Sequence, residues 1–270
     1  MTDFLNLRKG ASPLILSMPH GGHRLTAELE ARLTEAVLAT PDADWWIERL
    51  YDFAAEFEAS VVRTRLSRYV IDVNRDPSGA SLYPDRETTE LCPTLSFDGE
   101  PLYKSDREPD AAEIEDRKQK YFAPYHAALQ AEIDRVKGRH GFALLYDCHS
   151  IRSTVPRLFE GRLPVFNIGT NDGSSCAPGM EQAVAGACAA AKGFDHVVNG
   201  RFKGGWIIRH YGRPRDGVHA VQMELAQRAY MLEAPPWAFD HEKAVPLREV
   251  LKSVLRAILD WAQTNAGSTP

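Results

Sequence analysis

Two histidines in this sequence directly follow short apolar runs, at positions where a metal ion could be bound. His20 comes after the run 14–18 and opens a glycine turn that ends in a second histidine, His23. His149 follows another apolar run and stands two residues beyond Asp147. Imidazole nitrogens are common zinc ligands, and a nearby carboxylate can orient the ring. The alternatives are an exposed histidine in a turn for His20, and a buried histidine satisfied by Asp147 for His149.

Three other features could contribute to a site. The segment 72–77 contains Asn74 and Arg75, and it is either a charged loop or the carrier of a guanidinium that binds a carboxylate in a forked geometry. Glu224 stands between two apolar residues, so it is either paired structurally or has a raised pKa suited to general base catalysis. The segment 199–205 combines glycine with basic residues, but it lacks the pattern of a phosphate-binding P-loop.

The elements that must position these residues alternate along the chain. Apolar runs and alternation predict strands at 14–18, 61–62, 69–71, 142–146, 165–168 and 218–225. Helical spacing of apolar residues predicts helices over 46–57, over 125–136 with an end at Gly138, over 181–192, and over 247–259. This order favours an α/β fold with a parallel or mixed sheet, in which ligands bind beyond the carboxyl ends of the strands.

Residues 77–110 are rich in Pro, Gly, Ser, Thr and charge, and we expect a long ordered loop or lid anchored by Tyr83, Phe97 and Tyr103. We find no internal repeat and expect one domain over residues 1–263, followed by a frayed tail over 264–270.

Composition excludes several classes of partner. The formal net charge of −5, from 32 basic and 37 acidic residues, gives no footprint for nucleic acid or for an anionic membrane. The sequence contains neither a run long enough to span a membrane nor the apolar segment of a signal peptide. Its four cysteines form no C-x-x-C pair. We therefore expect a cytoplasmic protein that acts on a small molecule.

Taken together, these segments resemble the N-formylglutamate amidohydrolase (deformylase) family. The resemblance extends from residue 13 to about residue 232 and is carried by the stretches SMPHGG, DADWWIERLYD, SRYVIDVNRDPSG, LYP, LCPT, YHAAL, DCHSIRS, PRLF, FNIGTNDGSSC, NGRFKGGWIIRHYG and HAVQMELAQRAYM. A more distant similarity links the pattern to zinc carboxypeptidases and aspartoacylase-like deacylases. The fold implied is a single-domain three-layer α/β sandwich with a mixed sheet, of the phosphorylase/hydrolase-like (zinc-peptidase-like) type.

The resemblance implies one divalent metal ion, zinc, with His20 and His149 among its ligands and Glu224 as the catalytic residue. The carboxypeptidase pattern H-x-x-E is not met, because His23 occupies the place of the glutamate. The family pattern offers Asp44, at the start of a helix, as the remaining ligand. Asp44 could instead be a helix N-cap, and His23 is a rival ligand.

The activity implied is hydrolysis of N-formyl-L-glutamate to glutamate and formate, a step of histidine degradation. A dicarboxylate product requires cationic partners in the substrate site. The loops that match the family contain the candidates for substrate binding, which are Asn74, Arg75, Arg152, Arg201 and Arg209. These arginines could instead form surface ion pairs. Two other functions stay open, namely hydrolysis of another N-acyl amino acid or a cell-wall-type amide, and ligand binding by a protein that has lost the metal.

Overall fold

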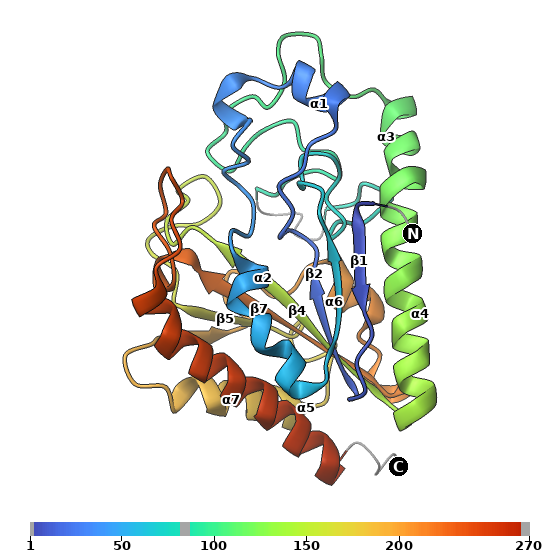
Figure 1. Cartoon of the computed structure of the whole chain (residues 1–270), viewed down its shortest axis with the longest axis vertical. Coiled ribbons are helices and arrows are strands. Elements are labelled where there is room, and N and C mark those ends of the chain that lie inside the picture. The colour runs from blue at the N-terminus through green and yellow to red at the C-terminus, as the bar shows by residue number, and fades with distance from the viewer. Residues whose placement is uncertain (1–2, 82–86, 266–270) are drawn as a thin grey trace.

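The computed structural model describes residues 3–81 and 87–265, and over these residues the chain forms one seven-stranded mixed sheet (Figure 1). The strand order is β1-β3-β2-β4-β7-β5-β6. The bounds are Leu5–Arg8 for β1, Leu14–Met18 for β2, Ser60–Thr64 for β3, Ala143–Ile151 for β4, Phe166–Gly169 for β5, His196–Val198 for β6 and Val218–Ala226 for β7. β1 is antiparallel to β3 and β5 is antiparallel to β7, whereas the other neighbours are parallel. The predicted α/β class with a mixed sheet is confirmed.

Helices cover both faces of the sheet, which makes three layers (Figure 1). One face packs against α4 (Ala123–His140) and α6 (Trp206–Tyr211), and the other packs against α2 (Ile47–Leu50), α5 (Pro178–Ala189) and α7 (His241–Asn265). Because successive strand residues point to opposite faces, β4 contributes alternately to both cores. A strand covered on both sides has to be apolar on both sides, which explains the uninterrupted apolar run of β4.

Several boundaries differ from the prediction. α4 continues through the expected stop at Gly138 and ends at Gly141, whose φ of 84° is the left-handed conformation that glycine adopts readily. The predicted helix 46–57 is divided into α2 and a 3₁₀ segment, Asp52–Phe57. α5 begins and ends earlier than 181–192. α7 includes residues 264 and 265 of the predicted frayed tail, and residues 266–270 lie outside the described residues.

The predicted strand 69–71 is wrong. These residues are buried, but residues 69 and 70 lie in a turn, residue 71 has no regular structure, and none of them belongs to a strand of the described sheet. Their apolar side chains pack into two of the hydrophobic clusters instead. The helices α1 (Ala27–Arg32), α3 (Ala111–Arg117) and α6, and the strands β1 and β6, were not predicted.

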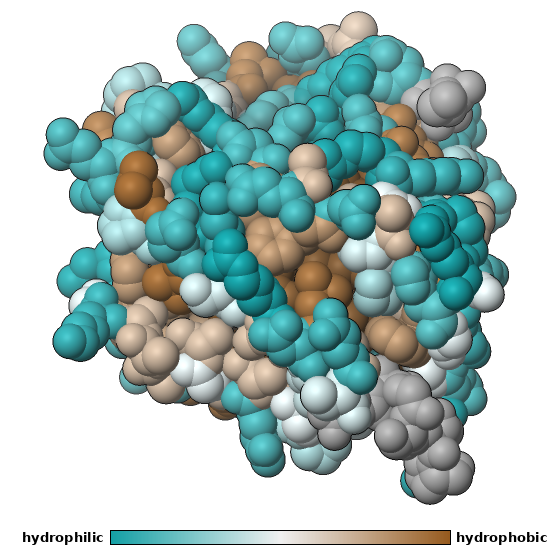
Figure 2. Space-filling model, turned by 60° about the horizontal axis from the view of Figure 1, so that its bottom comes forward, coloured by the Kyte–Doolittle hydropathy of each residue, from teal (hydrophilic) through white to brown (hydrophobic). Residues whose placement is uncertain are grey.

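Much of the long segment 77–110 is irregular, as predicted. Its expected anchors Phe97 and Tyr103 are 5% and 3% exposed, and Tyr83 lies outside the described residues. None of the described helices is both long and apolar enough to cross a membrane. The face shown in Figure 2 is largely hydrophilic with apolar patches between the polar side chains, an ordinary surface for a folded chain.

Candidate active site

The candidate site forms where three neighbouring parallel strands bring their carboxyl ends together. β4 lies between β2 and β7, and the register pairs Ser17 of β2 with Asp147 of β4. On the other side of β4, His149 is paired with Glu224 of β7. His20 follows β2 by two residues, so it reaches the same edge of the sheet. Residues that are far apart in the sequence are therefore adjacent here.

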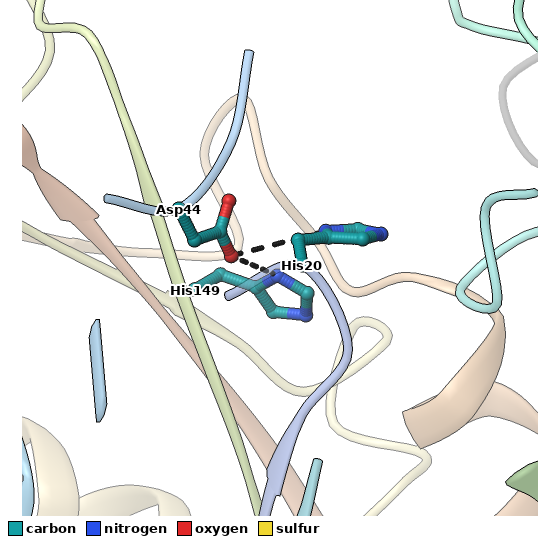
Figure 3. Close-up of side chains that lie close together, drawn as sticks. All are labelled: His20, Asp44 and His149. Carbon is teal, nitrogen blue, oxygen red and sulfur yellow. Dashed lines mark hydrogen bonds and ion pairs between the residues drawn. The ribbon is translucent and has the colours of Figure 1, made fainter. Parts of the chain in front are cut away.

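The three predicted metal ligands, His20, Asp44 and His149, form one buried group. Each offers a ligand atom within 4.8 Å of the others. Asp44 Oδ2 lies 3.0 Å from His149 Nδ1 and 3.8 Å from His20 Nδ1, so that the carboxylate faces both imidazoles (Figure 3). Two imidazole nitrogens and one carboxylate oxygen make a donor set that can hold a divalent metal ion.

Asp44 is positioned by its own backbone rather than by a helix. Its N–H donates to the carbonyl of His20 at 3.0 Å, which joins the two ligand loops. The N-cap of α2 is Trp46, which has a left-handed conformation and makes no side-chain cap, so Asp44 is not the N-cap. The rival ligand His23 does not belong to this group, and its Nδ1 lies 3.1 Å from Thr40 Oγ1 instead.

Each histidine of the group has a second carboxylate on its other nitrogen. His20 Nε2 donates to Asp72 Oδ1 at 2.6 Å, and His149 Nε2 donates to Asp147 Oδ2 at 2.9 Å. Because a carboxylate only accepts, Nε2 of each ring carries a proton, and Nδ1 is the nitrogen that faces Asp44. Without a metal ion, Nδ1 of His149 also donates to Asp44 at 3.0 Å, and a bound metal ion would take the place of that proton. Burial lowers the pKa of His149, but Asp147 and Asp44 more than offset this and raise that pKa well above its usual value.

His20, Asp44 and His149 line a cavity of about 770 Å³. Among the residues that the structure describes, Asn74, Arg75 and Arg201 line it, whereas Arg152 and Arg209 do not. Arg75 donates to both the carbonyl and the hydroxyl of Thr89. Arg201 donates to the carbonyls of residues 158 and 87.

The other predicted residues have structural contacts. Arg152 donates to Asp98 at 2.8 Å, and Arg209 donates to a backbone carbonyl at 2.9 Å. The amide nitrogen of Asn74 lies 3.0 Å from His149 Nε2 and 3.4 Å from Asp147 Oδ2. Asn74 therefore contacts the ligand group itself.

Glu224 also lines the cavity, with 7% of its surface exposed. Burial raises its pKa to about 8, while the nearby His149 cation acts in the opposite direction. Among the described residues, its hydrogen-bond partner is the uncharged amide of Gln222, at 3.2 Å, rather than an arginine. This environment differs from that of a structural ion pair.

Comparison with known proteins identifies the family of the chain. The sequence profile described as N-formylglutamate amidohydrolase matches residues 12–231. The chain belongs to the N-formylglutamate amidohydrolase family. It is 48% identical over 263 residues to N-formylglutamate deformylase of Pseudomonas aeruginosa, covering 97% of this chain and 98% of that protein. It is 46% identical over 261 residues to N-formylglutamate deformylase of Pseudomonas putida, covering 97% of each chain. The resemblance inferred from the sequence is confirmed.

Two solved structures share the fold. The crystal structure of N-formylglutamate amidohydrolase from Ralstonia eutropha JMP134 superposes with a TM-score of 0.80 at 24% identity, covering 97% of this chain and 98% of that chain. A gene product of Agrobacterium tumefaciens superposes with a TM-score of 0.70 at 20% identity, covering 94% of this chain and 96% of that chain. The sandwich is thus shared by proteins whose sequences differ at most positions.

Sequence reasoning missed two charged residues of this family member's site. Asp72 accepts a hydrogen bond from His20 and so orients its ring. It directly follows the apolar run 69–71, and a polar residue after an apolar run is the same signal that led to His149. Arg68 is 5% exposed, donates to Asp72 at 2.5 Å and has its guanidinium 4.8 Å from the ring centroid of Phe97. Its Nε has no hydrogen-bond partner among the described residues, and the side chain lines the cavity.

Proposed function

We propose that this chain hydrolyses N-formyl-L-glutamate to L-glutamate and formate by means of one divalent metal ion, zinc, held by His20, Asp44 and His149. The observation that carries the proposal is the convergence of these three donors with Glu224 in one cavity. The chain's membership of the amidohydrolase family supports the reaction type, and the names of its Pseudomonas relatives support the substrate. A place in histidine degradation, in the cytoplasm, is part of the same proposal.

The donor set fits zinc in a catalytic setting. Catalytic zinc sites use three protein ligands drawn from histidine, glutamate, aspartate and cysteine, which leaves a position for water or substrate. The second carboxylates, Asp72 and Asp147, also fit, because ligating histidines donate their other N–H to such partners. When bound, the ion would act as a Lewis acid and lower the pKa of water toward 7.

Glu224 acts as the general base in this proposal. It takes a proton from the attacking water and later delivers it to the amine nitrogen of glutamate as the C–N bond breaks. A carboxylate with a pKa raised by burial can do both, because its affinity for the proton is close to that needed near neutral pH. Glu224 and His149 line the same cavity and are paired with each other on the neighbouring strands β7 and β4.

The glutamate carboxylates require cationic partners on the cavity wall. Arg75 and Arg201 line the cavity, and Asn74 borders it beside His149, so we assign substrate binding to these three. Arg152 and Arg209 would act on the loops that shape the wall, through the contacts that they make there.

The test is formate release from N-formyl-L-glutamate by the purified protein, measured with metal content before and after dialysis against a chelator. We expect about one zinc per chain, loss of activity with the metal, and recovery when zinc is returned. N-acetylglutamate and N-formylglycine serve as matched substrates that change the acyl group and the carboxylate count. Full activity without metal would contradict the metal role, and a preference for another substrate would correct the function.

A further inference from the structure

Gln222 is a buried polar residue beside the proposed base. It lies in the family stretch HAVQMELAQRAYM, but it was not predicted as a site residue. It stands two residues before Glu224 on β7, so both side chains point to the same face of the sheet. It is 4% exposed and lines the same cavity. Across the strands it is paired with Asp147, just as Glu224 is paired with His149.

The direction of the Gln222 amide is set by a backbone group. The N–H of Gly205, the residue that precedes α6, lies 2.7 Å from Gln222 Oε1. A backbone nitrogen can only donate, so the oxygen of the amide must face Gly205. The NH₂ group is therefore directed to Glu224, with Nε2 at 3.2 Å from Oε2. Flipping the amide would break both contacts.

The same loop orients a second amide. The N–H of Ile207 donates to Asn74 Oδ1 at 2.8 Å, which turns the NH₂ group of Asn74 to the His149 side. A Cβ at position 205 would lie 2.3 Å from Asn74 Nδ2, so this close approach requires glycine. The start of α6 thus holds two amides whose NH₂ groups point into the site.

We propose that Gln222 is a positioning residue that holds Glu224 for proton transfer, an inference that rests on the proposed role of Glu224. By donating to Oε2, Gln222 keeps the carboxylate in one orientation and leaves Oε1 to take the proton. An O–H bond of water breaks as the Oε1–H bond forms, and the proton later passes to the leaving nitrogen. Because Gln222 is neutral, it orients the carboxylate without the stabilisation of the anion that an arginine would bring.

The first variant is Gln222→Met, which keeps the length of the side chain and removes the donor. We expect kcat for N-formylglutamate to fall by about 10- to 100-fold, with little change in KM, because a misdirected base acts on the reaction step rather than on binding. Zinc content and melting temperature are measured for the same protein.

A double-mutant cycle separates positioning from stability. In the Glu224→Gln background, adding Gln222→Met should change kcat by less than about twofold, because the group through which Gln222 acts is already lost. Gln227→Met is the matched control, since Gln227 is another buried amide just after β7, donating to Ala43 and Ser150. Its effect should be the same in both backgrounds. If Gln222→Met does not fold, Gln222→Asn replaces it in the cycle, because the shorter amide cannot reach both partners.

The outcomes of the two proposals are distinct. A Glu224→Gln variant with the kcat of wild type would overturn the proposed base and this inference with it. If Glu224→Gln loses activity but Gln222→Met keeps kcat, or lowers it equally in both backgrounds, Gln222 is not a positioning residue, and the proposed function stands.

Discussion

Two buried glutamates near opposite ends of the sheet have opposite surroundings. Glu132, on α4, is 1% exposed and accepts hydrogen bonds from Ser60 and from Arg135 Nε and Nη2, the latter two at 2.9 and 2.6 Å. Arg135 also donates to the carbonyl of Gly10, near the amino ends of the strands. Glu224, at the carboxyl ends, is also buried, with 7% of its surface exposed, but has a neutral amide as its partner.

The pKa values of the two carboxyls move apart accordingly. Burial raises the pKa of Glu132, but Arg135 and Ser60 more than offset it, and the net pKa is lowered. Burial raises the pKa of Glu224 to about 8, against the influence of the His149 cation. Burial raises the pKa of both carboxyls, and the charged donor beside Glu132 contributes to the opposite net direction there. A carboxyl that lines a cavity and has no charged donor is the better candidate for proton transfer.

The largest expected effect is that of Glu224→Gln. Loss of a general base costs about 10²–10⁴ in rate, and the loss should appear in kcat rather than in KM. Removing a carboxyl that is costly to ionise should leave the melting temperature unchanged or higher. Steady-state kinetics and thermal unfolding of the same protein check both. A destabilised variant with kcat within about tenfold of wild type, below that range, would mean that Glu224 resembles Glu132 after all.

Arg75→Lys extends the comparison to two arginines, Arg75 in the cavity and Arg135 beside Glu132. The charge is kept but the forked geometry is lost, so glutamate should bind more weakly by about 1.5–3 kcal/mol. Inhibition constants for glutamate measure this. Arg135→Lys is the matched control at the opposite end of the sheet, and it should lower stability without changing the inhibition constant. An unchanged constant for Arg75→Lys would reject its role in substrate binding.

Asp147→Asn tests the carboxylate that orients His149. Replacing a group that orients a ligating histidine typically costs about 10–100-fold in metal affinity. Zinc titration against a competing chelator gives the dissociation constant for zinc, and circular dichroism verifies that the variant is folded. Wild-type affinity in this variant would show that the 2.9 Å contact with His149 contributes to packing only.

Glu132→Gln should have the smallest effect on activity, with kcat and KM unchanged. Its free energy of unfolding should fall by about 1–3 kcal/mol at neutral pH, because charged hydrogen bonds to Arg135 are lost. The folded pKa of Glu132 lies below its unfolded value, so this stabilisation is present above the unfolded pKa and is lost as pH falls through the folded pKa. Urea unfolding at several pH values should show wild type and variant converging in acid, and a constant difference would contradict the ion-pair account.

The sequence predicted the ends of the strands better than the contacts between them. His20 and His149 could be found because each lies within three residues after an apolar run, and the two runs belong to parallel strands of one sheet. Asp72 also follows an apolar run, but its role could not be predicted, because it depends on His20, which is 52 positions away. The role of Gln222 depends in the same way on the N–H of Gly205. Local patterns do not contain these pairings.

The errors in the fold have a similar cause. The run 69–71 is apolar enough for a strand, but a strand needs a neighbour, and these residues bury their side chains in a turn instead. Gly138 and Gly141 are equally good helix stops by type, and only the second adopts the left-handed conformation, where the chain turns to enter β4.

The central claim is that His20, Asp44 and His149 hold one metal ion beside Glu224, and anomalous diffraction from crystals of the active protein tests it most directly. At the zinc absorption edge we expect a single peak about 2.0–2.2 Å from Nδ1 of each of the two histidines and from a carboxylate oxygen of Asp44. A peak bound by His23 in place of Asp44, or no peak in crystals whose dissolved protein is fully active, would contradict the account.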